Sequence, residues 1–190
     1  MSPSQHDTAF LEIEHKFLVG DGFALDTFLN ACRQLNPERE KALQVTDTYY
    51  LPGEGAKHIY RHRIDAEIQQ LTIKSRGGDN EVRTEINLNL GPVPSQEAEV
   101  RAWMRAVGAG EGQSIVKDIH VFDFPDCEIV YYEARRGERC VCCVEFEAKY
   151  AATESAGLEI LERYEAALGF DAQPREKTNL YDLLIGSTQP

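Results

Sequence analysis

Alternation of charged and apolar residues with a period of two recurs along the chain, and it restricts the fold more than any other feature. In such a run, residues i, i+2 and i+4 lie on one face of a strand and their neighbours on the other. The segment 81–90 (EVRTEINLNL) is the clearest example. Similar runs predict eight strands, at 11–19, 44–51, 58–64, 68–75, 81–90, 115–123, 128–135 and 139–149.

The connections between these strands predict antiparallel pairing. Glycine and asparagine in 77–80 and glycine in 136–138 tolerate the positive φ that hairpin turns need. Charged strand faces are compatible with an open sheet that has one solvated side, or with a closed barrel whose lumen holds the charges. For a single strand the open sheet is the commoner arrangement, but five strands with the same mixed charge favour the barrel.

Four segments have helical character. They are 23–34, 95–107, 154–168, which begins after a Thr153 cap and ends at Gly169, and a short helix within 174–185 with Pro174 in its first turn. These helices are expected to cover the outside or the ends of the barrel. The predicted class is therefore α+β: an eight-stranded antiparallel β-barrel with helices packed outside, in one domain over 1–190 whose core is about 10–185.

Composition limits the partners. The chain has 190 residues and a net charge of −12, so its surface should repel a nucleic-acid backbone. No apolar stretch approaches the roughly 18 residues of a membrane span, and the first ten residues do not resemble a signal peptide, so a cytoplasmic location is expected. The five cysteines lack zinc-ligand or disulfide spacing, which favours free thiols over a zinc site. A homodimer is left open.

The charged faces carry the candidate chemistry. Glu12 with Glu14, and Glu145 with Glu147, place two carboxylates on one face of a strand, which suits Mg²⁺ or Mn²⁺. Cations on the other strands would neutralise the oxygens of an anion in the same cavity. These cations are Lys16, Arg61, Arg63, Lys74 and Arg83. Acids for a metal and several bases for an anion indicate a polyphosphate, because a monophosphate would leave most of the cations unpaired.

With these residues identified, the sequence resembles the CYTH domain, or triphosphate tunnel metalloenzyme, family. Glu12-Ile13-Glu14-His15-Lys16 matches the ExExK motif of that family. Further elements follow in the family order from about residue 10 to 185. They are Thr46-Asp47-Thr48-Tyr49-Tyr50, Arg61 with Arg63, Leu71-Thr72-Ile73-Lys74, Arg83 with Glu85, Glu145 with Glu147, and Lys177 with Tyr181-Asp182-Leu183-Leu184. Asn87 and Leu51 stand where family members often have an acid.

The resemblance implies a tunnel that binds a triphosphate with a divalent metal. It implies that Glu12, Glu14, Glu145 and Glu147 are metal ligands, and that the phosphate-binding residues are Lys16, Arg61, Arg63, Lys74, Arg83 and Lys177. Lys74 and Glu85 are the predicted catalytic residues. Either a second metal positions the attacking water, or Lys74, with a pKa lowered by Arg61 and Arg63, acts as the base; simple phosphate neutralisation by Lys74 is the preferred alternative.

Four functions remain open at this point. Hydrolysis of inorganic triphosphate is favoured, because every recognisable element addresses phosphate or metal. Hydrolysis of a nucleoside or thiamine triphosphate is the next candidate. A class IV-type adenylyl cyclase would use the same tunnel, and a non-catalytic triphosphate- or polyphosphate-binding module remains compatible with Asn87 and Leu51.

Overall fold

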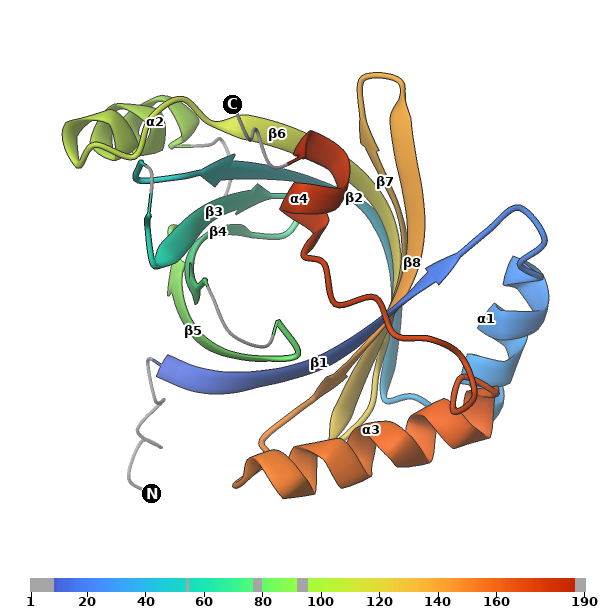
Figure 1. The fold of residues 1–190 in the computed structure, drawn as a ribbon. Helices are drawn as coiled ribbons and strands as arrows, with labels where there is room; N and C mark the ends of the chain where they lie inside the picture. The colour runs from blue at the N-terminus through green and yellow to red at the C-terminus, as the bar shows by residue number, and fades with distance from the viewer. Residues whose placement is uncertain (1–8, 54, 77–79, 92–95, 187–190) are drawn as a thin grey trace.

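The computed structural model describes residues 9–53, 55–76, 80–91 and 96–186. Eight antiparallel strands close into a barrel in the order β1-β5-β4-β3-β2-β6-β7-β8 (Figure 1). They are β1 (Ala9–Val19), β2 (Arg39–Tyr50), β3 (His58–Ile64), β4 (Gln69–Ser75), β5 (Val82–Asn89), β6 (Gln113–Asp123), β7 (Cys127–Arg136) and β8 (Arg139–Ala148). The predicted fold class is therefore confirmed.

The strand alternation separates a charged interior from an apolar exterior. On β1, Glu12, Glu14 and Lys16 line the lumen, whereas Ile13 and Phe17 point outward into the largest apolar core. That core lies between the outer faces of β1, β7 and β8 and the helices α1 (Leu25–Gln34) and α3 (Glu154–Leu168), as Figure 1 shows. Burial of apolar surface between barrel and helices therefore holds the charged strand faces inside.

The other two helices lie elsewhere on the barrel. Helix α2 (Glu97–Ala106) packs Val100 and Met104 against outward-facing Tyr50 and Leu71. Helix α4 (Leu180–Ile185) lies across one end of the barrel (Figure 1). It buries Leu180 and Leu184 in a cluster with Tyr49, Ile59, Ile115 and Tyr132, which belong to the inner faces of their strands. Helix α4 therefore fills part of one end of the lumen.

Predicted and observed elements differ mainly at their ends. Strand β2 starts at Arg39, five residues before the predicted start at 44, since it continues to pair with β6 along its charged beginning. The helix predicted within 174–185 begins only at Leu180, where the Asn179 side chain accepts a hydrogen bond from the Asp182 N–H, so Pro174 is not in its first turn. Gly137 has φ +58° in the predicted hairpin turn. Most of the turn predicted at 77–80 lies outside the described residues.

Helix α3 is bounded as predicted. The Thr153 side chain accepts a hydrogen bond from the Ala156 N–H, and Gly169 ends the helix with φ +75°, a conformation that favours glycine. Its Gly157 lies against Ile13, where an added Cβ would come 2.3 Å from Ile13 Cδ1. The close approach of α3 to β1 therefore depends on glycine at position 157, which has no side chain. None of the helices within the described ranges is long and apolar enough to cross a membrane.

Candidate functional site

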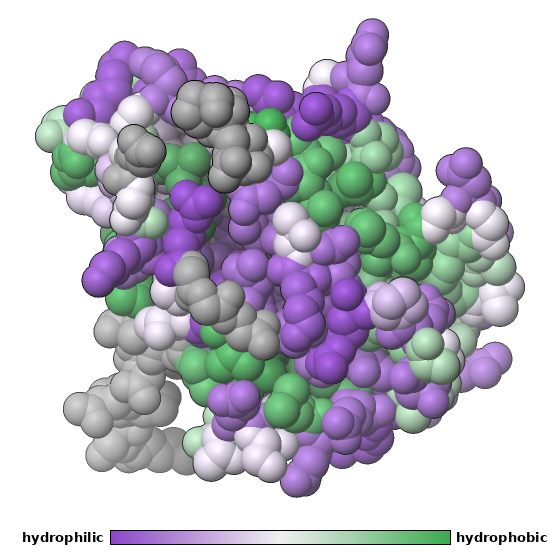
Figure 2. Space-filling model, in the orientation of Figure 1, coloured by the Kyte–Doolittle hydropathy of each residue, from purple (hydrophilic) through white to green (hydrophobic). Residues whose placement is uncertain are grey.

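The lumen contains a cavity of about 460 Å³, lined by side chains from all eight strands and from the beginning of α4. Figure 2 views the end on which α4 lies, and hydrophilic side chains gather around the middle of this face. Among the charged side chains that line the lumen, two facing groups are named the acidic wall and the basic wall. The acidic wall is Glu12 and Glu14 on β1 with Glu145 and Glu147 on β8, and the basic wall is Arg61 and Arg63 on β3, Lys74 on β4 and Lys117 on β6.

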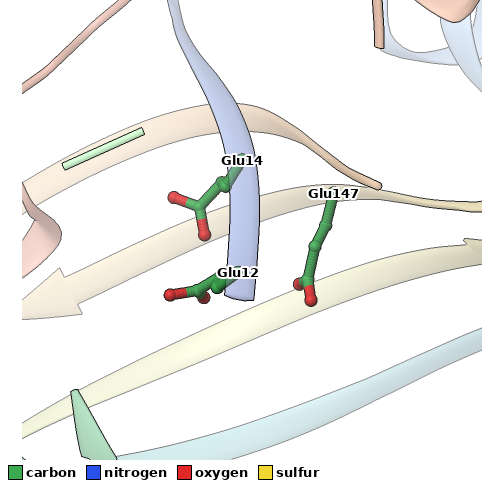
Figure 3. A group of neighbouring side chains, drawn as sticks. All are labelled: Glu12, Glu14 and Glu147. Atoms are coloured by element: carbon green, nitrogen blue, oxygen red, sulfur yellow. The ribbon is translucent and has the colours of Figure 1, made fainter. Parts of the chain in front are cut away.

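Three carboxylates of the acidic wall converge. Glu12 and Glu14 on β1 and Glu147 on β8 approach one another, with one oxygen from each within 4.8 Å of the others (Figure 3). The β1–β8 register produces this arrangement, because Glu14 lies directly opposite Glu147. Burial, and then the charges of Glu12 and Glu128, raise the pKa of Glu147 well above its ordinary value of 4.5. The group has the oxygen donors and the excess negative charge that a hard divalent cation needs.

Glu145 lies outside this group, although it was predicted as a metal ligand. The Tyr132 hydroxyl donates a hydrogen bond of 2.7 Å to its carboxylate, and Lys16 Nζ lies 3.4 Å away. Burial lowers the pKa of Lys16, but Glu145 and Glu14 together outweigh this effect and raise it. The two glutamates of β8 therefore have different surroundings: one joins other carboxylates and the other joins a lysine and a tyrosine.

Lys74 and Glu85, the predicted catalytic residues, form a buried pair with Nζ and Oε2 2.6 Å apart. Lys74 Nζ also lies 2.5 Å from Glu12, and Arg83 Nε donates to the other oxygen of Glu12 at 3.0 Å. Burial raises the pKa of Glu85, but Lys74 and Arg61 outweigh it and lower the pKa to about 2. Lys74 thus joins the two walls across the lumen.

The pKa of Lys74 moves in the direction opposite to the hypothesis that it is a base. Burial and Arg61 lower it, but Glu12 and Glu85 outweigh them, and the net shift is upward. A lysine with a raised pKa stays protonated and cannot accept a proton from water at neutral pH. This finding contradicts the lowered pKa expected from Arg61 and Arg63, and it favours charge neutralisation as the role of Lys74.

The two arginines of β3 differ in how completely they are paired. Arg63 makes two hydrogen bonds to Asp47, at 2.7 and 2.9 Å. Arg61 is 8% exposed, donates to Thr72 at 3.2 Å and lies 4.0 Å from Glu85. Its Nε is buried without a hydrogen-bond partner among the described residues. A buried guanidinium with an unused donor is free to bind an anion in the lumen.

Asp47 and Lys117 lie in the site but are not among the residues predicted for it. Asp47 is fully buried, with Lys117 Nζ 2.6 Å from its second oxygen, and Arg63 and Lys117 outweigh its burial to hold its pKa well below the usual range. Burial lowers the pKa of Lys117. The period-two rule, applied to 115–123, puts Lys117 on one strand face with Ile115 and Ile119, and the barrel shows that this face is the inner one.

Lys177 lies apart from the other predicted phosphate-binding residues. Its Nζ is 2.7 Å from Glu81 Oε2, its side chain is more than half exposed, and it is not among the residues that line the cavity. The backbone nearby is attached to β1, since the Glu176 N–H donates to the Lys16 carbonyl at 2.7 Å. The other predicted residues, Glu12, Glu14, Lys16, Arg61, Arg63, Lys74, Arg83, Glu85, Glu145 and Glu147, all line the one cavity.

Several solved structures share the fold of this chain at low sequence identity. PH1012 from Pyrococcus horikoshii matches with a TM-score of 0.74 at 15% identity, over 91% of this chain and 99% of its own. A conserved hypothetical protein from Pyrococcus furiosus has a TM-score of 0.72 at 19% identity, over 91% and 99%. HpAC1 from Hippeastrum, described as having a dominant triphosphatase activity, has a TM-score of 0.61 at 15% identity, over 93% and 94%. No protein-family model matches the sequence.

Proposed function

We propose that the chain is a metal-dependent triphosphatase that removes the terminal phosphate from a triphosphate held between the two walls. The observation that most supports this proposal is that a group of three carboxylates faces a wall in which the buried Arg61 Nε has an unused N–H donor. The acidic wall thus has negative charge around Glu147, and the basic wall has a hydrogen-bond donor on Arg61, that the protein leaves unsatisfied. A divalent cation together with a polyphosphate would complete both.

The cation is expected to be Mg²⁺ or Mn²⁺, held by Glu12, Glu14 and Glu147. When bound there, it would supply positive charge to the phosphate oxygens and neutralise charge that develops as the bond breaks. Glu12 also pairs with Lys74 and Arg83, and these two cations would lie beside the metal site to neutralise phosphate oxygens. The acidic wall fits the cation by donor type, by spacing and by the raised pKa of Glu147.

The residues of the chain bind and orient the substrate. Arg61, Lys74, Arg83 and Lys16 neutralise the non-bridging oxygens and hold the terminal phosphorus in line with an attacking water. Water forms a new bond to that phosphorus, the bridging P–O bond breaks, the proton that the water loses passes to a phosphate oxygen, and orthophosphate leaves together with the shortened diphosphate. Glu85 keeps Lys74 charged and in place. Inorganic triphosphate, the substrate favoured by the sequence, is the smallest ligand that uses all of these groups.

The test is phosphate release from inorganic triphosphate, ATP and thiamine triphosphate in Mg²⁺ or Mn²⁺. Glu14→Gln and Lys74→Ala should each lower kcat/KM by at least about a hundredfold, because each removes a charged group from the site of bond cleavage. The matched controls are Glu159→Gln and Lys57→Ala, which change exposed residues outside the lumen and should retain wild-type rates.

Two outcomes would contradict the proposal. Metal-dependent binding of a triphosphate without release of phosphate from any of the three would leave a cyclase or a binding module, and formation of cyclic AMP from ATP would identify the first. Equal loss of activity in the control variants would show that folding, and not the lumen, is responsible.

A further inference from the structure

We infer that His15 and Arg175, whose side chains lie outside the lumen, are positioning residues for the site. They hold residues 175–178, here called the strap, against β1, and the strap in turn keeps Lys16 in place beside the acidic wall. This inference rests on the proposed function, because Lys16 is one of the cations assigned to the phosphates. Neither His15 nor Arg175 is among the described residues that line the cavity.

A series of hydrogen bonds joins α3, β1 and the strap on the outer face of β1. His15 is 2% exposed, and Glu165 on α3 is 6% exposed. His15 Nδ1 lies 2.5 Å from Glu165 Oε1, and Arg175 Nη1 lies 2.6 Å from His15 Nε2. Because a guanidinium can only donate, Nε2 accepts from Arg175, and Nδ1 carries the proton that is donated to Glu165. The ring of His15 thereby links a carboxylate on α3 to the cation that begins the strap.

The strap is attached to the backbone of β1 on both sides of His15. Figure 1 shows the connection between α3 and α4 crossing β1, and at this crossing the Glu176 N–H donates to the Lys16 carbonyl at 2.7 Å. On the other side, the Glu81 carboxylate lies 3.4 Å from Arg175 Nη1, and the Glu81 carbonyl accepts from the Glu14 N–H at 2.9 Å. Two residues that line the lumen, Glu14 and Lys16, are therefore tied to the strap through their backbones.

The side chain of Lys16 also reaches the strap. Its Nζ lies 3.4 Å from the Thr178 carbonyl oxygen, 3.4 Å from Glu145 and 3.6 Å from Glu14. An ammonium group has three protons, so these three acceptors match its capacity. Lys16 is 5% exposed, and loss of the Thr178 carbonyl would leave a buried proton unpaired or draw Nζ toward the two carboxylates. Either change would weaken the contact of Lys16 with a phosphate oxygen.

The segments before and after the strap are held by apolar packing, which does not depend on the bond between His15 and Arg175. Phe170, just beyond α3, is buried in the largest apolar core, with its ring centroid 5.0 Å from that of Phe17. Helix α4 buries Leu184 at the end of the barrel. The contacts described above that attach the strap itself are polar. Breaking the bond between His15 and Arg175 should therefore release the strap without unfolding α3 or α4.

The experiment measures equilibrium binding of inorganic triphosphate in Mg²⁺, which does not require hydrolysis. Arg175→Ala should weaken binding about tenfold when Lys16 is present, and by less than about twofold in the Lys16→Ala background, because the strap acts through Lys16. His15→Phe removes the same hydrogen bond from the other side and should have the same effect. In both variants the Glu176 amide should exchange its hydrogen about tenfold faster, since its bond to the Lys16 carbonyl opens more often.

Arg33→Ala is the matched control. It breaks a partly exposed arginine–glutamate pair whose residues are not among the described residues that line the cavity, and it should leave both binding and exchange intact.

An equal loss of binding in the presence and absence of Lys16 would overturn the positioning role, and so would faster exchange of the Glu176 amide without weaker binding. Hydrolysis of inorganic triphosphate at the wild-type rate by Arg175→Ala and His15→Phe would retain the triphosphatase and overturn the positioning role. Binding that weakens as expected, without release of phosphate from any substrate by the wild type, would support the positioning role and overturn the triphosphatase. Failure of the wild type to bind inorganic triphosphate would overturn both.

Discussion

The acidic and basic walls face each other across the lumen, but they differ in how the protein compensates their charge. On the basic wall, Asp47 is inserted between Arg63 and Lys117, 2.7 Å from the first and 2.6 Å from the second. On the acidic wall, Glu147 has carboxylates for neighbours, and its pKa rises. The basic wall thus carries an anion of its own, whereas on the acidic wall Glu12, Glu14 and Glu145 have cationic partners and Glu147 lies mainly among carboxylates.

This difference predicts what each wall is for. A permanent counter-ion keeps the cations in place when no substrate is bound, so the basic wall is pre-organised for an anion. Carboxylates that lie close together are costly to ionise, and a bound metal would offset that cost. Part of the folding free energy should therefore be recovered only in the metal-bound protein. The walls should therefore respond in opposite ways to the loss of one carboxylate.

The largest effect is expected on the basic wall. Asp47→Asn leaves Arg63 and Lys117 buried without their anion, and breaking a buried ion pair in this way costs about 3–5 kcal/mol. The free energy of unfolding from urea denaturation measures the loss. Asp118→Asn, on the outer face of the barrel, is the control and should change it by less than about 1 kcal/mol.

The same variant also tests whether the basic wall binds an anion. Inorganic triphosphate should stabilise Asp47→Asn more than it stabilises the wild type, because the ligand replaces the lost charge. Equal stabilities of the variant and the wild type would show that Asp47 does not hold the two cations together.

Strand alternation made the walls largely predictable from the sequence, whereas the difference between them was not. Glu12 and Glu14, and likewise Glu145 and Glu147, share a strand face by spacing alone, and all four line the cavity. Which glutamate of β8 joins the carboxylates depends on register: Glu14 lies opposite Glu147 and Lys16 opposite Glu145. Register is a property of two strands and cannot be found in either one.

The residues that were missed or misplaced have the same explanation. Lys117 is followed by Asp118 on the other face, so the charges of 115–123 do not indicate which face is inside. Lys177 lies in an irregular segment with no period, and only the contacts of that segment place its side chain on Glu81. The early residues of β2 are charged and give no apolar alternation, so its start at Arg39 depends on pairing with β6.

Removal of a carboxylate from the acidic wall is expected to raise the stability of the protein, by less than the loss of Asp47 lowers it. The folded-state pKa of Glu147 is above its ordinary value of 4.5. In the pH window between these two pKa values, Glu147 holds a proton in the folded protein that it has already lost in the unfolded chain. Raising the pH through the window removes that proton and lowers the stability of the metal-free protein. Glu147→Gln lacks the titrating group, so at neutral pH it should unfold at a higher temperature than the wild type, and its stability should fall less as the pH rises.

The Glu147→Gln variant should bind metal more weakly than the wild type although it is more stable. Mg²⁺ or Mn²⁺ binding should weaken by at least about tenfold, since even groups outside the ligand shell have effects of this size. Glu145→Gln removes the neighbouring glutamate, which lies outside the three-carboxylate group, and is the matched comparison. A Glu147→Gln variant that binds metal like the wild type, or that is less stable at neutral pH, would contradict the assignment.

The smallest effect tests whether the acidic wall depends on packing outside the barrel. Ile13 lies between Glu12 and Glu14 and touches α3 at Gly157, so Gly157→Ala should press on Ile13 Cδ1 and displace the two carboxylates. Crowding costs about 1–3 kcal/mol, and the better helix propensity of alanine returns a little under about 1 kcal/mol, so a net loss on the order of 1–2 kcal/mol is expected.

Ile13→Val removes the crowded methyl group and, by itself, costs about 0.5–1.5 kcal/mol. In the double variant Gly157→Ala/Ile13→Val the two losses should therefore not add, and metal affinity, lowered in Gly157→Ala, should recover. Urea denaturation of the wild type, the two single variants and the double variant measures the coupling in stability. Metal titration of the same four proteins measures the coupling in metal affinity. Additive losses of stability would mean that β1 moves away from α3 as a unit. Recovery of stability without recovery of metal affinity would mean that the carboxylates of Glu12 and Glu14 hold their position independently of α3.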